Sequence, residues 1–444
     1  MEFTGERTLW SFVDEEKKQN INLPRRLSFG NHESDTHLAS PRTSCASAAS
    51  FPLWPMSPET PWVRSPLHAS PPTSSLLYHC VASLHRSEGK IFSITSSKHF
   101  VFTASDSRRI HAWKLPDCTE MGFIKANAGG IRAILAHGKY LFTAHGDYKI
   151  RVWEVPPTES FQPRKITTLP RRSFLLYPRM NSHKDYISCI AYNYMENLLY
   201  TGSWDKTVKV WKIKEKQCID SFVAHEGQVN AIVINQEDGC VFSGSSDGTV
   251  KIWRRVYRES SHILTMTLKF QPSPVNALAL SLLSSGCFLY SGSADGLINY
   301  WQKERMSGRF NHRGFLQGHH FAVLCLVSIG DLLLSGSEDA TIRVWRREEG
   351  NSFHSCLAVI DGHHGPVKCL AASLETSDML IGLLVYSASL DQTFKVWRVK
   401  VYLAETLNTE KSDPKHSQAE KECQMSPVLS PSWVERKMQA NHFE

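Results

Sequence analysis

The stretch TGSWDKTVKVW at residues 201–211 decides the fold, because six variants of it occur elsewhere in this chain of 444 residues. Each variant begins with a small pair of residues, carries an Asp at or next to its fifth position and ends in Trp. The variants are TASDSRRIHAW (103–113), TAHGDYKIRVW (143–153), SGSSDGTVKIW (243–253), SGSADGLINYW (291–301), SGSEDATIRVW (335–345) and SASLDQTFKVW (387–397). A pattern that returns every 40–58 residues indicates an array of stacked structural units.

The residues of one copy predict short strands. The alternation in TVKVW (207–211) has the period of two that is typical of a half-buried β-strand. Asp205 favours a tight turn before it, because an Asp side chain can bond to the nearby backbone. Apolar runs such as ISCIAY (187–192) and LLYTGS (198–203) add strands upstream, so each unit holds about four antiparallel strands. One such sheet cannot bury both of its faces alone, so the array predicts an all-β fold, a β-propeller.

A His precedes four of the repeats, in the strings SHKDYI, AHEGQV, GHHFAV and GHHGPV. We expect the His, Ser or Thr, Asp and Trp of one repeat to form a single hydrogen-bonded chain, because a buried carboxylate without partners is very costly. The four sets are His183, Thr201, Asp205 and Trp211; His225, Ser243, Asp247 and Trp253; His319, Ser335, Asp339 and Trp345; His363, Ser387, Asp391 and Trp397.

The combination of GH, [ST]G[SA]xD and a closing Trp resembles the WD-repeat family over roughly residues 76–402. TGSWDKTVKVW, GTVKIWRR (248–255), RGFLQGHHFAVLCL (313–326) and GHHGPVKCLA (362–371) look like plant WD-repeat proteins of the JINGUBANG type. The resemblance implies seven blades, with residues 75–84 as the outer strand of the seventh. It also departs from the family, because no repeat has Asp after its Trp. Ser87, Asn127 and Gln271 stand where His is expected, so their three blades should have weaker networks.

The domain organisation follows from composition. We expect a disordered Ser/Pro-rich leader at 1–74, the propeller at 75–402 and a polar, disordered tail at 403–444. Within residues 38–75, 20 of the 38 residues are Ser, Thr or Pro. The segment therefore has too few apolar groups to offset the entropy of ordering. The leader is either a featureless linker or, through Phe51, Trp54 and Trp62, a short recognition motif.

Kinase-type contexts surround several serines of the leader. Ser28 follows an Arg pair, and Ser57, Ser65 and Ser70 each precede Pro, so all four are candidate phosphosites. The interval between Trp153 and Trp211 is the longest. It holds either a solvated loop with one outer strand or a basic finger for an acidic partner.

No catalytic constellation is visible in the sequence. There is no GxSxG elbow, Walker loop, HExxH or kinase signature, so we expect no enzyme and no cofactor. The 11 Cys form no CxxC pair, and adjacent His residues on a strand point to opposite faces, so no metal site is expected. No apolar stretch approaches the ~20 residues that a membrane span needs. We expect a monomeric ring in the cytoplasm, with the nucleus as a second compartment.

The residue before each turn Asp is a candidate position for contacting partners. These residues are Gly146, Trp204, Ser246, Ala294, Glu338 and Leu390, and Phe321 and Tyr186 lie beside the repeat His residues. Trp204 stands out, since Trp is enriched among interface hot spots. The other possibility is that it packs on a neighbouring loop.

Three functions compete at this stage. A protein-interaction scaffold or regulator in plants, binding a transcription or signalling factor, is the interpretation that the resemblance favours; pollen or growth control is implied by the resemblance alone. A substrate receptor of a cullin-RING ubiquitin ligase and a nucleic-acid or chromatin binder are the alternatives. The net charge of +7 and five Arg-Arg pairs support the last, but no groove-reading motif does.

Overall fold

The computed structural model describes residues 76–401, except 86–88, 127–128, 157–160, 171–181, 258–260, 271, 285, 349–352 and 378–379. The predicted leader, the predicted tail and the four candidate phosphosites lie outside the described residues, as do Ser87, Asn127 and Gln271.

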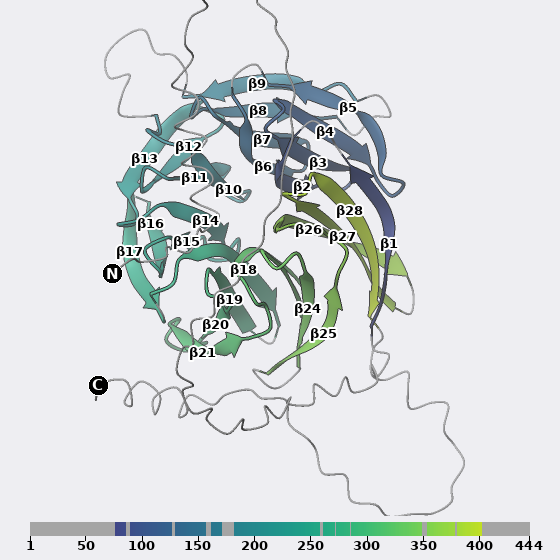
Figure 1. The fold of residues 1–444 in the computed structure, drawn as a ribbon. Coiled ribbons are helices and arrows are strands. Elements are labelled where there is room, and N and C mark those ends of the chain that lie inside the picture. Colours follow the sequence, from purple (N-terminus) through teal and green to yellow (C-terminus); the bar gives the residue numbers. More distant parts are fainter. Residues whose placement is uncertain are drawn as a thin grey trace, which may run out of the picture. The chain divides into compact units, whose positions relative to one another are not determined.

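The described residues form seven four-stranded antiparallel sheets, arranged as the blades of a ring (Figure 1). In blades 1 to 6 the four strands are consecutive in the chain. Blade 1 has β2 (Ile91–Ser96), β3 (Phe100–Ser105), β4 (Arg109–Lys114) and β5 (Thr119–Lys125); blade 2 has β6 (Ile131–His137), β7 (Tyr140–His145), β8 (Ile150–Glu154) and β9 (Arg164–Leu169). Blade 3 has β10 (Ile187–Asn193), β11 (Leu198–Ser203), β12 (Thr207–Lys212) and β13 (Gln217–Val223); blade 4 has β14 (Val229–Ile234), β15 (Val241–Ser245), β16 (Thr249–Val256) and β17 (Ser261–Lys269). Blade 5 has β18 (Val275–Leu283), β19 (Gly286–Ser293), β20 (Ile298–Lys303) and β21 (Phe310–Leu316); blade 6 has β22 (Val323–Ile329), β23 (Leu332–Ser337), β24 (Ile342–Arg347) and β25 (His354–Ile360). The predicted all-β, seven-bladed propeller is confirmed.

The seventh blade closes the ring with strands from both ends of the described chain. It consists of β26 (Val367–Ser377), β27 (Leu380–Ser389), β28 (Thr393–Val401) and β1 (Leu76–His85). β1 runs antiparallel to β28, and Leu76 opposes Val401 at one end of the pair while His85 opposes Thr393 at the other. The expectation that residues 75–84 supply the outer strand of this blade is therefore confirmed. Without β1, β28 would be an open sheet edge, which invites pairing with other chains.

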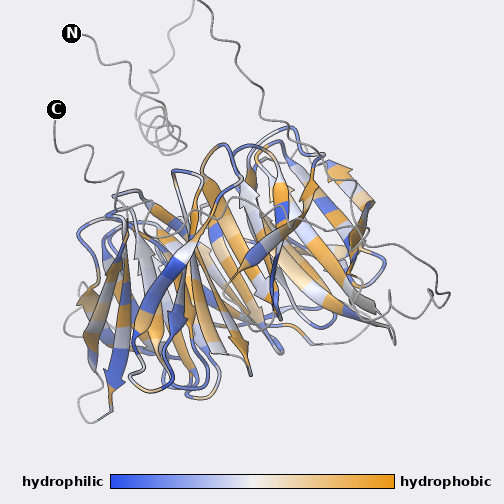
Figure 2. Ribbon diagram, turned by 90° about the horizontal axis from the view of Figure 1, so that it is seen from below, coloured by the Kyte–Doolittle hydropathy of each residue, from blue (hydrophilic) through white to orange (hydrophobic). Residues whose placement is uncertain are grey.

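The hydrophobic core lies between neighbouring blades, and it explains the small residues of each repeat. A side chain at Gly202 would place its Cβ 2.6 Å from Val229 Cγ1 of the next blade, so only a residue without a side chain fits there. The closing tryptophans fill the same seams: Trp253 packs with Tyr200 and Val208 of blade 3. Hydrophobic residues accordingly run along the strands, while hydrophilic residues gather in the loops that join them (Figure 2).

The two long intervals between repeats have different structures. The longest interval supplies the outer strand β9, where Arg164 Nη2 lies 2.6 Å from Glu154 Oε2 in an ion pair. Of the basic residues of the proposed finger, Arg164 and Lys165 lie on β9, and Arg171, Arg172 and Arg179 lie outside the described residues. The long interval before Trp397 is a β26–β27 hairpin extended to the pair Ser377 and Leu380.

Candidate interaction face

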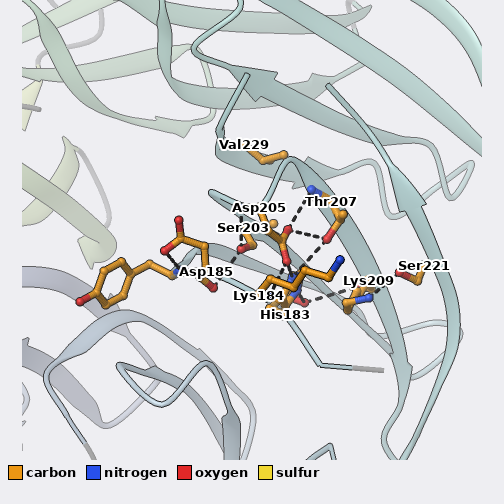
Figure 3. A network of polar contacts seen from close by, with 12 residues as sticks. His183, Lys184, Asp185, Ser203, Asp205, Thr207, Lys209, Ser221 and Val229 are labelled. Atoms are coloured by element: carbon orange, nitrogen blue, oxygen red, sulfur yellow. Dashed lines mark hydrogen bonds and ion pairs between the residues drawn. The ribbon is translucent and has the colours of Figure 1, made fainter. Parts of the chain in front are cut away.

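A polar relay in blade 3 connects the buried end of the sheet to the turn between β11 and β12 (Figure 3). Trp211 Nε1 donates to Thr201 Oγ1 at 2.9 Å, and Thr201 Oγ1 lies 2.8 Å from His183 Nε2. On the other side of its ring, His183 Nδ1 lies 3.0 Å from Asp205 Oδ2. Because a carboxylate only accepts, Nδ1 carries the proton and Nε2 accepts from the Thr201 hydroxyl.

The same relay recurs in blades 4, 6 and 7. The Trp–hydroxyl, hydroxyl–His and His–Asp distances are 2.9, 2.8 and 2.9 Å for Trp253, Ser243, His225 and Asp247. They are 2.9, 2.7 and 2.9 Å for Trp345, Ser335, His319 and Asp339, and 2.8, 2.7 and 3.3 Å for Trp397, Ser387, His363 and Asp391. The structure thus brings each of the four sequence-predicted sets together.

Hydrogen bonds keep the Asp205 carboxyl group of the blade 3 relay ionised. Burial alone would raise the pKa of Asp205, but hydrogen bonds from His183 and Thr207 outweigh it and hold that pKa well below its usual range. Burial lowers the pKa of His183, and Asp205 offsets this only in part. At neutral pH the relay therefore consists of a carboxylate and a neutral imidazole, an arrangement that holds the turn in place.

Blade 2 replaces the relay with a different arrangement that sequence reasoning missed. His145, on β7, lies 2.7 Å from Thr143 Oγ1 through its Nε2, so it takes the place of the loop His. Asp147 instead accepts two hydrogen bonds from Arg151, at 3.1 and 2.8 Å. Burial, with a contribution from Arg151, lowers the pKa of His145 to about 3. The signal was present in the sequence, because all six other repeats have Ser where this one has His145.

Blades 1 and 5 have shorter networks. In blade 1, Trp113 Nε1 donates to Thr103 at 3.0 Å, and Ser105 and Ser107 contact each other at 2.7 Å. In blade 5, Asp295 accepts from Ser293 Oγ at 2.6 Å and from the backbone of Leu297 at 3.0 Å.

The turns place the candidate contact residues on one face of the ring, called the loop face below. In each blade from 2 to 7, the residue before the turn Asp donates its backbone N–H to the residue that precedes the inner strand. The pairs are Gly146–Gly130, Trp204–Tyr186, Ser246–Gln228, Ala294–Pro274, Glu338–Ala322 and Leu390–Pro366, at 2.9–3.0 Å. In blade 1 Asp106 makes this bond, to Lys90, which agrees with its place one residue early in the repeat.

An aromatic cluster occupies the loop face over blades 2 and 3. Trp204 and Tyr186 meet edge to face with ring centroids 5.5 Å apart, and Tyr186 meets Tyr148 in the same way at 5.6 Å. All three side chains are half-buried. Trp204 and Tyr186, both predicted, are thus brought together, and Tyr148 was missed. We call these three residues the aromatic cluster.

The other predicted contact residues lie on the loop face of blades 6 and 7. Phe321 is 61% exposed, which makes it the most accessible aromatic residue of this face among the described residues. Glu338 and Leu390 are half-buried, and burial raises the pKa of the Glu338 carboxyl. These three residues therefore belong to the same face as Trp204 but to a different sector of it.

Arg132, at the start of β6, extends the aromatic cluster toward the centre of the ring. Its guanidinium carbon lies 5.1 Å from the Tyr186 ring centroid and 4.3 Å from that of Phe92 in blade 1. Neither Arg132 nor Phe92 was predicted, because each belongs to an inner strand and the repeat motif gives no sign that three blades meet there.

Searches for other kinds of site among the described residues gave no result. No group of three or more His, Cys, Asp or Glu gathers in that part of the chain in a way that could hold a metal ion. The described segments also contain no helix that is both long enough and apolar enough to cross a membrane. The cysteines within them are free thiols.

Comparison with known families gives one match. The family described as WD domain, G-beta repeat matches residues 176–212, 216–254, 263–302, 310–346 and 354–398. These segments correspond to blades 3 to 7. Blades 1 and 2, which are unmatched, are two of the blades whose networks depart from the full relay. Among curated proteins, no significant match to the chain was found.

Proposed function

Because this chain belongs to the WD40 repeat family, we propose that it is a non-enzymatic scaffold that binds a partner protein on its loop face. The observation that carries the proposal is the aromatic cluster. Three half-buried aromatic side chains gather on turns that the relay and its neighbouring hydrogen bonds hold in place. Aromatic side chains on a rigid support supply large contact area at little entropic cost, as interface hot spots do.

The relays support this proposal because they hold the loops of the loop face in place. Asp205 accepts hydrogen bonds from the backbone of Lys184 at 2.8 Å and of Thr207 at 3.0 Å, so one carboxylate ties together the two loops that carry Tyr186 and Trp204. A partner would therefore meet a preformed surface, and less of the binding free energy would be spent on ordering loops.

The finer role rests on the resemblance to plant JINGUBANG-type proteins. It supports regulation of plant signalling or development, with a transcription or signalling factor as the partner and the cytoplasm and nucleus as the compartments. The ring itself acts as a monomer in this proposal, and the leader, through its candidate phosphosites, adjusts binding.

The test is quantitative affinity capture from plant extract with the full-length chain. Wild type is compared with Trp204→Ala and with Val223→Ala, a matched control that removes a 72% exposed hydrophobic residue from outer strand β13. We expect a set of proteins to be lost with Trp204→Ala and kept with Val223→Ala, at unchanged melting temperature. Equal capture by all three proteins contradicts the proposal. Capture that falls steeply with salt and disappears with nuclease treatment indicates the nucleic-acid alternative.

A further inference from the structure

Each inner strand contributes one residue near its loop-face end to a set of seven, which is called the collar here. Each inner strand has a bulge that leaves its second residue out of register, as Ser188 is between the pairs Ile187–Ser203 and Cys189–Gly202. Bulged residues are re-aimed away from the regular sheet. The collar consists of Phe92, Arg132, Ser188, Asn230, Asn276, Leu324 and Lys368.

Three collar residues donate hydrogen bonds to the backbone of the next blade. Ser188 Oγ donates to the carbonyl of Val229 in the next blade. Asn230 Nδ2 donates to Val275 O at 2.9 Å, and Asn276 Nδ2 donates to Val323 O at 3.1 Å. This side of the collar is therefore neutral and structural.

Arg132 is different, because its charge is held in place without a counter-ion. The Phe92 and Tyr186 rings orient its guanidinium, yet no carboxylate among the described residues pairs with it. Other arginines of the ring do have such partners: Arg151 pairs with Asp147, Arg255 with Glu196, Arg346 with Asp331 and Arg398 with Glu375. A half-buried guanidinium with unused donors is a binding group for a planar anion, since its fork matches a carboxylate in two parallel hydrogen bonds.

Lys368 strengthens the positive potential of this sector. It is the collar residue of blade 7, so it flanks Phe92 on the side opposite Arg132. Burial lowers the pKa of Lys368, and Arg132 lowers it further while Glu338 acts in the other direction. Arg132 and Lys368 therefore repel each other, and an anion bound near Arg132 would offset that repulsion.

We propose that the collar binds a carboxylate side chain of an acidic peptide segment in the partner, which pairs with Arg132 while a neighbouring apolar residue of the peptide packs on the aromatic cluster. This inference rests on the proposed function and names the chemistry of the partner. The geometry favours an Asp or Glu close in sequence to an aromatic or aliphatic residue, because Tyr186 contacts both Arg132 and Trp204.

The surroundings argue against a polyanion as the occupant. Asp106 and Glu226 lie exposed on the loop face, and Glu338 is half-buried there. A nucleic acid laid across the face would meet all three negative charges, whereas one carboxylate reaching Arg132 would not.

The test measures binding of short peptides to the full-length protein. The probes are extended peptides that combine one Glu with one Trp, Phe or Leu at varied spacing. Matched sets carry Gln or phosphoserine in place of Glu, and a single-stranded oligonucleotide serves as the polyanion. We expect Glu peptides to bind about tenfold more tightly than their Gln counterparts, the effect of losing one charge-assisted pair.

Variants locate the binding group. Arg132→Gln is expected to abolish the preference for Glu over Gln, and Arg132→Lys to restore part of it, since Lys keeps the charge but not the fork. Arg313→Gln, which removes an exposed arginine from outer strand β21, is expected to bind like wild type. Equal melting temperatures of Arg132→Gln, Arg132→Lys and wild type show that the ring is intact in each, so that a lost preference for Glu reports on binding.

The outcomes separate this inference from the proposed function. Absence of a Glu preference in wild type, an unchanged preference in Arg132→Gln, or tighter binding of phosphoserine peptides or the oligonucleotide overturns the inference. Loss of captured partners with Trp204→Ala but not with Arg132→Gln keeps the loop face as the functional site and rejects the acidic ligand. Equal capture by both variants and wild type contradicts the proposed function itself.

Discussion

Replacing Asp205 with Ala should destabilise the ring far more than the same change at Asp295, although both are turn Asp residues of the repeat. Asp205 accepts hydrogen bonds from His183 and from the backbone of Lys184 and Thr207, while its side chain is only 6% exposed. Asp295 is exposed and has no His partner among the described residues.

The expected difference comes from the groups that each substitution leaves behind. The His183 side chain is 0% exposed, so without Asp205 its Nδ1–H would keep only the Thr207 hydroxyl, at 3.2 Å, and would have no access to water. A buried donor that loses its main acceptor costs about 1–3 kcal/mol, and the loss of the charge-assisted bonds from the Lys184 and Thr207 amides brings the total to about 3–5 kcal/mol. Asp295→Ala loses only bonds that solvent can replace, at about 0–1 kcal/mol.

Thermal unfolding followed by circular dichroism measures this difference. For a ring of roughly 330 residues the unfolding entropy is about 0.7 kcal/mol/K, so a loss of about 4 kcal/mol lowers the melting temperature by about 6 °C. Asp295→Ala should lower it by no more than about 1–2 °C. Equal shifts for the two variants would refute the view that the His–Asp relay stabilises the turn. Because the pKa of Asp205 is held low, its contribution is present above the ordinary pKa of 3.8 and is lost as the pH falls below it.

Three further predictions concern other parts of the ring. Deletion of residues 1–74 should leave the melting temperature unchanged. Deletion of residues 1–85 also removes β1, with its packed Leu76 and Leu84, and should lower the free energy of unfolding by about 5 kcal/mol or more. Equal melting of the two truncated proteins would show that β1 does not close the ring. The pKa of His145 is lowered to about 3, so its contribution to the free energy of unfolding is complete above pH 6.5 and falls by about 1.4 kcal/mol per pH unit on acidification toward pH 3. The melting temperature of His145→Ser should therefore fall less steeply than that of wild type between pH 6.5 and 4.5. Parallel curves for the two proteins would argue against a buried neutral imidazole. In hydrogen exchange, the Leu297 amide, which donates to Asp295, should exchange faster than the amides that donate to the relay Asp residues. Those amides belong to Thr207, Thr249, Thr341 and Thr393. Uniform exchange rates would contradict the view that the turns are weaker in the blades without the relay.

Most of the fold could be predicted from the sequence because the repeat encodes its own packing. The small residue at Gly202, the turn at Asp205 and the closing Trp211 each satisfy a local requirement that recurs in every blade. Seven copies therefore specify seven sheets, and the number of sheets then specifies a closed ring. The role of β1 followed in the same way, because a blade without its fourth strand leaves an open edge.

The candidate site was harder to predict because it is formed between repeats. Trp204 stood out by residue type alone. Arg132 and Phe92 belong to different blades and occupy bulged positions that the period of two does not mark. The contacts of Arg132 with Phe92 and with Tyr186 depend on neighbouring blades meeting, which only the assembled ring provides. Substitutions within a blade, such as His145 for Ser, were visible in the sequence, but their consequence depended on which partner lay opposite.

The central claim is that the loop face, held by the relays, is where partners bind. Its most direct measurement is hydrogen exchange of the full-length protein with and without a partner captured by wild type and lost with Trp204→Ala. We predict added protection in residues 183–188 and 203–207, the two segments that carry Tyr186 and Trp204, and at the start of β6 around Arg132. Protection confined to the outer strands, or to segments outside the ring, would contradict the claim.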